Sequence, residues 1–229
     1  MTLAAVVFDL DGVLVDSEHL WEENWVAYAA RHGVQWTPGD TATVQGMSAP
    51  EWAAYLARHS GTSESVEEVE RAVVDGMIEA VEAGKAPLLP GAADMVTEVS
   101  ARVPVALASS ATRRVIDAVL ATYGLTAEFS ATVSSAEVPR GKPSPDVYLE
   151  AAARLGHAGS DCLAVEDSSN GIRAAAAAGL TVVALPNRTY PPKPDALELA
   201  SAVAGTNDEA RRTLLAYLAG EPVTSKGTS

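Results

Sequence analysis

Residues 4–17 read Ala-Ala-Val-Val-Phe-Asp-Leu-Asp-Gly-Val-Leu-Val-Asp-Ser, an apolar run that ends at two carboxylates, Asp9 and Asp11. A short continuous apolar run is typical of a strand that is buried on both faces of a parallel sheet. Gly12 then permits a sharp turn. Paired carboxylates at the end of such a strand can bind Mg²⁺ and divide the roles of nucleophile and proton donor, although the same pair could simply cap a turn.

Similar apolar runs recur along the chain and alternate with amphipathic stretches. We expect further strands at residues 103–108, 130–133, 162–165 and 181–185, and helices at residues 91–101, 112–122, 144–155 and 170–178. Strands that alternate with helices of this length predict βαβ units and a parallel sheet. The expected fold class is therefore α/β, a Rossmann-like three-layer core that binds its ligand at the carboxyl ends of the strands.

The segment 17–87 interrupts this alternation because it contains no convincing strand. We expect helices at residues 17–31, 49–59 and 64–83, the first of them capped at Asp16-Ser17. Pro87 and Pro90-Gly91 mark the return to the α/β pattern. The predicted organisation is a core of residues 1–16 and 88–220, an inserted α-helical cap of residues 17–87 and a flexible tail of residues 221–229.

Composition excludes several classes of function. Among 229 residues there are 30 acidic and 16 basic side chains, a net charge of −14, and the densest basic spots, Arg113-Arg114 and Arg211-Arg212, form no stripe that would overcome repulsion from nucleic acid. The lone Cys162 fits a reducing compartment. No apolar run approaches the length of a membrane span, and the N-terminal segment lacks a signal-peptide pattern. We expect a monomeric cytoplasmic protein without nucleic-acid or membrane partners.

Three more polar positions follow expected strands or lie in a constrained loop. The hydroxyl of Ser109 and the free amides of the next helix could bind a phosphoryl oxygen, or Ser109 could be an ordinary helix cap. Lys142, between a glycine and a proline, could place its charge against a phosphoryl group, although a lone lysine usually lies in solvent. Glu166 and Asp167 could supply oxygen ligands for a cation, or merely cap the following helix.

Residues 8–17 resemble the first motif of the haloacid dehalogenase superfamily, in the subfamily IA whose helical cap follows that motif. Ser109, Lys142 and the pair Glu166-Asp167 are similar to its other three motifs and occur in the same order. The resemblance extends over roughly residues 1–190 and is strongest to the β-phosphoglucomutase-like and sugar-phosphatase-like members.

The resemblance implies a Mg²⁺-dependent phosphatase that hydrolyses small sugar or polyol phosphates through an aspartyl-phosphate on Asp9, with Asp11 as general acid and base. It also implies that Asp167 binds the metal directly and that Glu166 acts through water. We further expect Asp16 to lie with these acids near the cavity. The implied sets are catalytic Asp9, Asp11, Ser109 and Lys142; metal-binding Asp9, Asp11, Asp167 and Glu166; and phosphate-binding Ser109, Ser110 and Lys142.

Other activities are less well supported. Dehalogenases of the superfamily work without metal and lack the paired aspartates. A β-phosphoglucomutase-type mutase is the alternative, but Trp21 stands where that enzyme has a cap histidine, no arginine follows Ser48, and Ala111 and Arg113 replace its phosphate-contacting serine and asparagine. A non-catalytic regulatory protein would require degraded motifs, and all four are intact.

The cap supplies candidates for substrate contacts. Trp21 and Trp25 share one helix face, so they either line the pocket or pack the core of the cap, which contains all four tryptophans. The expected cap residues of the substrate site are Glu18, His19, Trp21, Met47 and Ser48.

Overall fold

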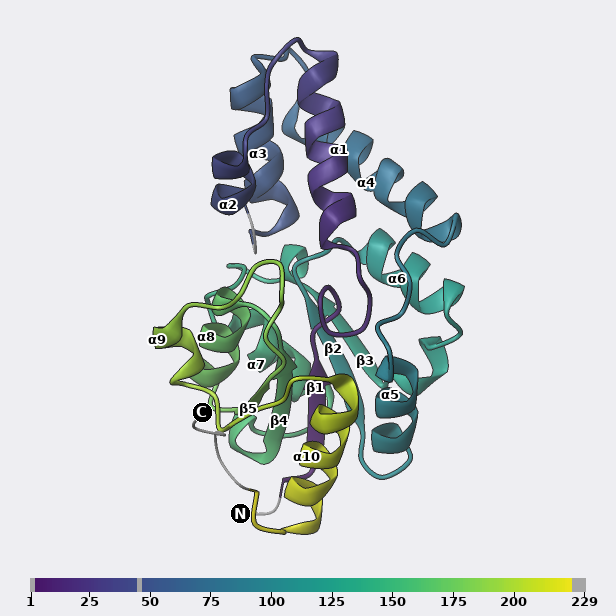
Figure 1. Cartoon of the computed structure of the whole chain (residues 1–229), viewed down its shortest axis with the longest axis vertical. Coiled ribbons are helices and arrows are strands. Elements are labelled where there is room, and N and C mark those ends of the chain that lie inside the picture. The colour runs from purple at the N-terminus through teal and green to yellow at the C-terminus, as the bar shows by residue number, and fades with distance from the viewer. Residues whose placement is uncertain (1–2, 45–46, 224–229) are drawn as a thin grey trace.

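A six-stranded parallel sheet forms the centre of the molecule (Figure 1). The computed structural model describes residues 3–44 and 47–223. The strand order is β3-β2-β1-β4-β5-β6, which confirms the predicted α/β class and adds one strand, β6, too short to be recognised in the sequence. The strands are β1 (Ala5–Phe8), β2 (Val105–Ser109), β3 (Ala131–Ser134), β4 (Cys162–Glu166), β5 (Thr181–Ala184) and β6 (Ala202–Val203).

Strand β1 lies in the middle of the sheet, with Val6 opposite Val105 of β2 and Leu163 of β4. All four of its residues are fully buried, which explains why its sequence is apolar throughout and does not alternate. The chain builds β2 and β3 on one side of β1 and then returns to build β4, β5 and β6 on its other side. The strand order therefore reverses at β1, and the crevice in which such folds bind ligands opens at its carboxyl end.

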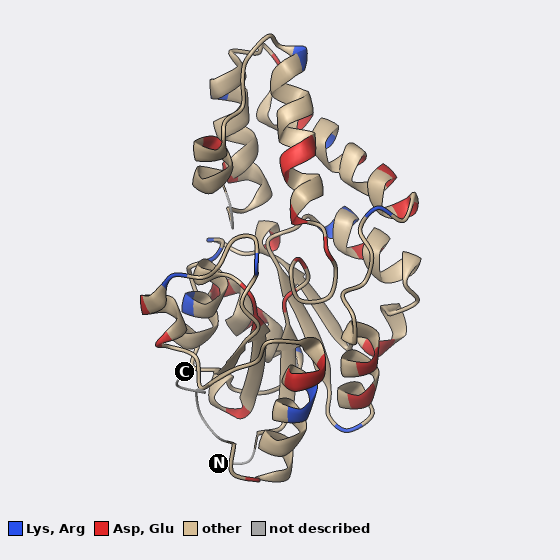
Figure 2. Ribbon diagram, in the orientation of Figure 1, with Lys and Arg blue, Asp and Glu red and all other residues tan. Residues whose placement is uncertain are grey.

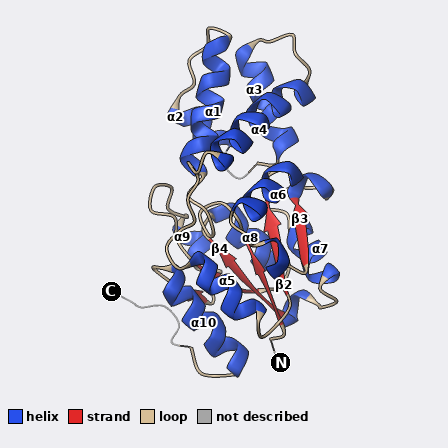
Figure 3. Ribbon diagram, turned by 90° about the vertical axis from the view of Figure 1, so that its right-hand side faces the viewer, coloured by secondary structure: helices blue, strands red, loops and turns tan. Residues whose placement is uncertain are grey.

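Helices cover both faces of the sheet and give the predicted three layers (Figure 3). Val6 and Phe8 pack against α5, α6 and α10, whereas Ala5 and Val7 pack against α7, α8 and α9, as the alternation of side chains along a strand requires. The helices of the core are α5 (Ala92–Ser100), α6 (Arg113–Thr122), α7 (Asp146–Arg154), α8 (Ser169–Ala177), α9 (Pro194–Leu197) and α10 (Asn207–Ala219).

Four further helices lie together beyond the carboxyl ends of the strands (Figure 1). They are α1 (Glu18–Arg31), α2 (Pro38–Val44), α3 (Ala49–Ser60) and α4 (Val66–Glu82), and the sequence analysis missed α2. The chain leaves and re-enters the core side by side, because Asp16 N donates to Pro87 O at 2.9 Å. We call residues 17–87 the cap. Its separation from the core as a domain stays a prediction, and residues 224–229 of the predicted tail lie outside the described residues.

The four tryptophans pack against one another inside the cap. The ring centroids of Trp25 lie 6.1 Å from Trp21, 6.0 Å from Trp36 and 6.1 Å from Trp52, and all four side chains are buried. The core-packing alternative for Trp21 and Trp25 therefore holds. Such short helices bury little surface unless bulky side chains fill the space between them.

Acidic residues are spread over the helices of cap and core, and Lys and Arg occur singly or in short groups along the described ribbon (Figure 2). None of the described helices combines the length and the apolar character that crossing a membrane requires.

Asp40 ties α2 to α3, which explains why a helix forms where the sequence shows little pattern. Its Oδ2 accepts from Thr37 N at 2.8 Å, and its Oδ1 accepts from the Tyr55 hydroxyl at 2.6 Å. The hydrogen bonds from Thr37 and Tyr55 lower the pKa of Asp40 to about 2.

We therefore expect Asp40→Asn to lower the free energy of unfolding by about 1–2 kcal/mol at neutral pH. Because the folded pKa lies below the ordinary 3.8, this contribution is present above about pH 4 and is lost as the pH falls toward 2. Urea unfolding of both proteins between pH 6 and pH 2 measures it, with exposed Glu23→Gln in α1 as control. A difference that stays constant down to pH 2 would contradict the role of the carboxylate.

Candidate active site

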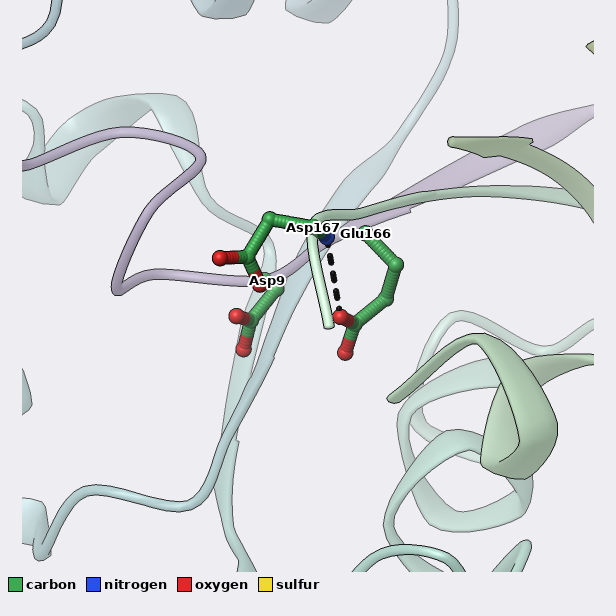
Figure 4. A group of neighbouring side chains, drawn as sticks. All are labelled: Asp9, Glu166 and Asp167. Atoms are coloured by element: carbon green, nitrogen blue, oxygen red, sulfur yellow. Dashed lines mark hydrogen bonds between the residues drawn. The ribbon is translucent and has the colours of Figure 1, made fainter. Parts of the chain in front are cut away.

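Three carboxylates meet at the carboxyl ends of β1 and β4 (Figure 4). Asp9 directly follows β1, Glu166 is the last residue of β4, and Asp167 comes next. One oxygen from each lies within 4.8 Å of the others, and all three side chains are buried. Since oxygen ligands are what Mg²⁺ prefers, this cluster has the chemistry of a divalent-cation site.

Lys142 reaches into this cluster from the loop before α7. Its Nζ donates to Asp9 Oδ1 at 2.7 Å, to Glu166 Oε1 at 2.6 Å and to the carbonyl of Ala108 at 3.1 Å. Only 6% of Lys142 is exposed, so it is not the solvated lysine of the alternative interpretation. The hydroxyl of Tyr148, on α7, also donates to Glu166 Oε1, at 2.7 Å.

One ammonium does not compensate three buried carboxylates. Burial, and then the charge of Glu166, raise the pKa of Asp9 to about 8 despite the proximity of Lys142. Burial and the charges of Glu166 and Asp9 raise the pKa of Asp167 well above its ordinary value. Burial acts to lower the pKa of Lys142, but the charges of Asp9 and Glu166 outweigh it and raise that pKa. The residues present therefore fit a bound cation, which would relieve the repulsion among them.

Glu166 is held on both oxygens. Besides the bonds to Oε1, its Oε2 accepts from the amides of Asp167 at 3.1 Å and Ser168 at 3.3 Å. Gly171, on α8, leaves room for this carboxylate, since a Cβ there would lie 1.8 Å from Oε1. Ser168, and not Glu166 or Asp167, caps α8 by accepting from Gly171 N at 3.1 Å. Glu166 therefore anchors Lys142 and the end of β4.

Asp11 lies apart from this cluster and faces the cap. Its Oδ1 accepts from the Ser17 hydroxyl and from Trp21 Nε1, the latter at 3.0 Å. Ser17 is the N-cap residue of α1, as expected, but its side chain makes no cap hydrogen bond because its hydroxyl is used for Asp11. The expectation that Asp16 joins the acids is wrong, because Asp16 is exposed and lies 3.6 Å from His19.

The loop between β2 and α6 offers a serine pair beside the cluster. Ser109 is fully buried, and its hydroxyl accepts from Ala111 N at 3.0 Å. Thr112, and not Ser109, is the N-cap of α6 and accepts from Val115 N. Ser110 and Ala111 line a cavity between the acidic cluster and the cap.

A cavity of about 90 Å³ lies between the acidic cluster and the cap. Asp9, Asp11, Lys142 and Asp167 form its floor. Its cap side is walled mainly by apolar and aromatic side chains, with Thr41 and Glu18 among them. The apolar and aromatic residues of this wall are Trp21, Trp25, Val44, Met47 and Trp52, and Tyr190 from the loop after β5 lies beside them.

Three of the five expected cap residues, Glu18, Trp21 and Met47, line the cavity. The other two do not. His19 projects beside exposed Asp16, and Ser48 caps α3 in a reciprocal pair of hydrogen bonds with Glu51. Trp21 and Trp25 thus meet both interpretations that the sequence left open, since they pack in the core of the cap and also line the cavity.

The family follows from comparison with known proteins. A family model described as haloacid dehalogenase-like hydrolase matches residues 3–179. The chain belongs to this family. The predicted family is therefore confirmed.

Individual relatives support an enzyme of phosphatase type. Hexitol phosphatase B of Escherichia coli K12 is 34% identical over 190 residues, which cover 80% of this chain and 84% of that protein. The bifunctional riboflavin kinase/FMN phosphatase of Arabidopsis thaliana is 33% identical over 186 residues, and the match spans 80% of this chain but only 48% of that protein. The structure of CbbY from Rhodobacter sphaeroides in complex with phosphate has a TM-score of 0.81 at 26% identity, over 91% of this chain and 96% of that chain.

The loop after β5 brings further residues to the site of this hydrolase. Asn187 Nδ2 donates to Asp167 Oδ2 at 3.1 Å and to the carboxylate of Glu18. The Tyr190 hydroxyl donates to Glu22 Oε2 at 2.8 Å, so the loop connects the acidic cluster with α1. The sequence analysis assigned no role to these two residues. The signal that could have found Asn187 is its place after an expected strand, like Asp9 and Asp167.

In this hydrolase the turn after Asp11 leaves no room for a side chain at Gly12. Gly12 has a φ of +75°, and a Cβ there would lie 2.1 Å from Asp167 Oδ2. Gly33, in the cap, has a similar φ of +72° but open space around it.

We expect Gly12→Ala to reduce hydrolysis of p-nitrophenyl phosphate by about 100-fold or more, because it displaces Asp167. Gly33→Ala carries the same backbone strain without the clash, so it should lower stability modestly and retain activity. Measuring turnover and melting temperature of both variants separates the two effects. Equal losses of activity would show that strain, and not the position of Asp167, is responsible.

Proposed function

We propose that this hydrolase is a Mg²⁺-dependent phosphatase of small phosphorylated metabolites, sugar or polyol phosphates, that acts through an aspartyl-phosphate on Asp9. The observation that carries the proposal is the buried cluster of Asp9, Glu166 and Asp167, in which Lys142 pairs with Asp9 and Glu166, beside a small cavity. The phosphatases among its relatives agree with the reaction type.

Asp9 and Asp167 are the proposed direct metal ligands. Glu166 already uses both oxygens for Lys142, Tyr148 and two amides, so contact through water suits it better. When bound, Mg²⁺ would offset the charge of the phosphoryl group and polarise its oxygens. Asp11 lies outside the cluster of carboxylate oxygens, which argues against its side chain as a ligand.

The remaining steps belong to the chain's own residues. A carboxylate oxygen of Asp9 attacks phosphorus, the bond to the leaving oxygen breaks, and that oxygen takes a proton from Asp11. Asp11 then accepts a proton from water, whose oxygen attacks the aspartyl-phosphate and releases inorganic phosphate. Lys142 keeps Asp9 in place, and the cluster would repel the dianionic substrate without this positive charge.

The charges around the cavity favour a neutral leaving group. Among the described lining residues, Lys142 is the only cation, and it is occupied by Asp9 and Glu166. The cap side adds Glu18, which would repel a second anionic group on the substrate. Aromatic rings such as Trp25 and Trp52 suit the C–H faces of a sugar. The Thr41 hydroxyl donates to Glu22 and accepts from Trp36, which leaves it able to accept one further hydrogen bond. A single-phosphate sugar or polyol ester meets these conditions.

A mutase needs a second phosphate-binding site, and Arg113 does not provide one. That guanidinium is held by Glu137 at 2.7 Å and by the carbonyl of Thr132 at 2.7 Å, and it does not line the cavity. It is therefore committed elsewhere and does not offer the second phosphate site that a bisphosphate intermediate requires.

Asp9→Asn should abolish hydrolysis of p-nitrophenyl phosphate in the presence of Mg²⁺, because the amide is neither an effective nucleophile nor a charged ligand. Chelation of the metal should abolish wild-type turnover, and added Mg²⁺ should restore it. Asp16→Asn is the matched control, since Asp16 is exposed outside the cavity and should leave turnover unchanged. Retained activity of purified Asp9→Asn would refute the mechanism.

A panel of substrates tests the proposed class. We expect kcat/KM for glucose 6-phosphate or a polyol monophosphate to exceed that for fructose 1,6-bisphosphate and phosphoglycolate by about 10-fold or more, because the latter place a second anion near Glu18. Phosphate release measured with each compound provides the ratio. Isomerisation of β-glucose 1-phosphate that depends on a bisphosphate primer would instead favour the mutase.

A further inference from the structure

Two donors from the start of the cap fix the side chain of Asp11. The Ser17 hydroxyl and Trp21 Nε1 both donate to Oδ1, although Asp11 itself belongs to the turn after β1 in the core. Among the described residues, none donates a hydrogen bond to Oδ2. Since Asp11 lines the cavity, this arrangement leaves Oδ2 for the substrate.

We propose that Trp21 is a positioning residue for proton transfer by Asp11, in addition to its packing role. The inference rests on the proposed function, in which Asp11 protonates the leaving oxygen. An indole N–H can only donate a hydrogen bond, and the unprotonated oxygen of a carboxyl group is a better acceptor than its hydroxyl oxygen. Two donors at Oδ1 therefore favour Oδ2 as the oxygen that carries the transferable proton.

The proton balance of both steps then depends on the same oxygen. While Asp9 bonds to phosphorus and the ester bond breaks, the leaving oxygen receives the electron pair of that bond and the proton of Oδ2. Asp11 remains as a carboxylate, held by Ser17 and Trp21 through charge-assisted hydrogen bonds. In the second step Oδ2 takes a proton from the attacking water, whose oxygen bonds to phosphorus while the bond between phosphorus and Asp9 breaks. Inorganic phosphate leaves, and both Asp9 and Asp11 return to their starting states.

Trp25 provides a matched comparison within the same helix. Trp25 lies one turn after Trp21, and both side chains line the cavity. The centroids of the two rings are 6.1 Å apart. Its Nε1 is buried without a hydrogen-bond partner among the described residues. Replacing either tryptophan by phenylalanine thus removes similar volume from the cavity wall, but only Trp21→Phe removes a hydrogen bond to Asp11.

The experiment compares two leaving groups of nearly equal shape. The nitro group of p-nitrophenyl phosphate stabilises the departing phenolate, so its departure needs little protonation, whereas phenyl phosphate depends on the acid. The ratio of kcat/KM for the two esters reports the step in which the ester bond breaks. A purely structural effect on folding or on the amount of active enzyme changes both values by the same factor and leaves the ratio unchanged.

Trp21→Phe should lower kcat/KM for phenyl phosphate by about 10-fold more than for p-nitrophenyl phosphate, and Trp25→Phe should leave the ratio of the two as in the wild type. Ser17→Ala should change the ratio in the same direction as Trp21→Phe, and it serves as the second variant if the cap tolerates no change at Trp21. An unchanged ratio in the folded variant at either position, or an equal change with Trp25→Phe, would overturn the inference.

Wild-type kinetics separate this inference from the function on which it rests. If the wild type hydrolyses p-nitrophenyl phosphate with Mg²⁺ but the ratio does not respond to Trp21→Phe or Ser17→Ala, the phosphatase stands and the positioning role fails. If the wild type hydrolyses neither ester, the proposed function fails and the positioning role fails with it.

Discussion

The contact of Lys142 with Asp9 and Glu166 is the interaction on which the rest of the site depends. It joins residues 133 and 24 positions apart in the sequence, and every member is buried. A buried charge costs several kcal/mol unless it is paired and hydrogen-bonded. Lys142 donates hydrogen bonds to three acceptors, two of which are carboxylates, so its own charge is well compensated. The carboxylates are less well compensated, because Lys142 pairs with Asp9 and Glu166 but not with Asp167.

This excess of buried negative charge points to a function, because selection for stability alone would not retain it. A core that only needed to be stable would replace some of these acids by apolar groups. The surrounding residues instead accommodate these acids. Gly12 and Gly171 leave room for Asp167 and Glu166. Tyr148 and two backbone amides donate hydrogen bonds to Glu166. Sites where buried charges exceed what stable packing favours, but are held in place by specific neighbours, are commonly functional sites. A cation and a phosphoryl group would complete the charge balance.

The sequence predicted the core well because the relevant information is local. Each apolar run ended at a polar residue, and parallel strands bring their carboxyl ends to one edge, so Asp9, Ser109 and Glu166 had to be neighbours. All five expected strands are present within two residues of their predicted bounds. Strand β6 and helix α2 were missed, since a two-residue strand has no periodicity and α2 depends on the bonds of Asp40 to distant Tyr55.

The cap side was less predictable because it depends on how two separate segments approach each other. Within α1, helical geometry already separates the candidates: Glu18, Trp21 and Trp25 are spaced at i, i+3 and i+7 and share a face, whereas His19 lies about 100° away. The structure agrees, as the first three line the cavity. The partners of this face, Asn187 and Tyr190, come from a loop after β5 that carries no local pattern pointing to the cap.

The first turns of α1 are consequently where cap and core chemistry meet. Ser17 and Trp21 hold Asp11 on one side, while Glu18 shares Asn187 with Asp167 on the other. A shift of α1 relative to the sheet would therefore disturb Asp11 and the acidic cluster together. Because the same helix also walls the cavity with tryptophans, the side chains that line the cavity are directly connected to those that hold Asp11. In the proposed mechanism, substrate fit and catalytic geometry would thus be coupled through α1 itself.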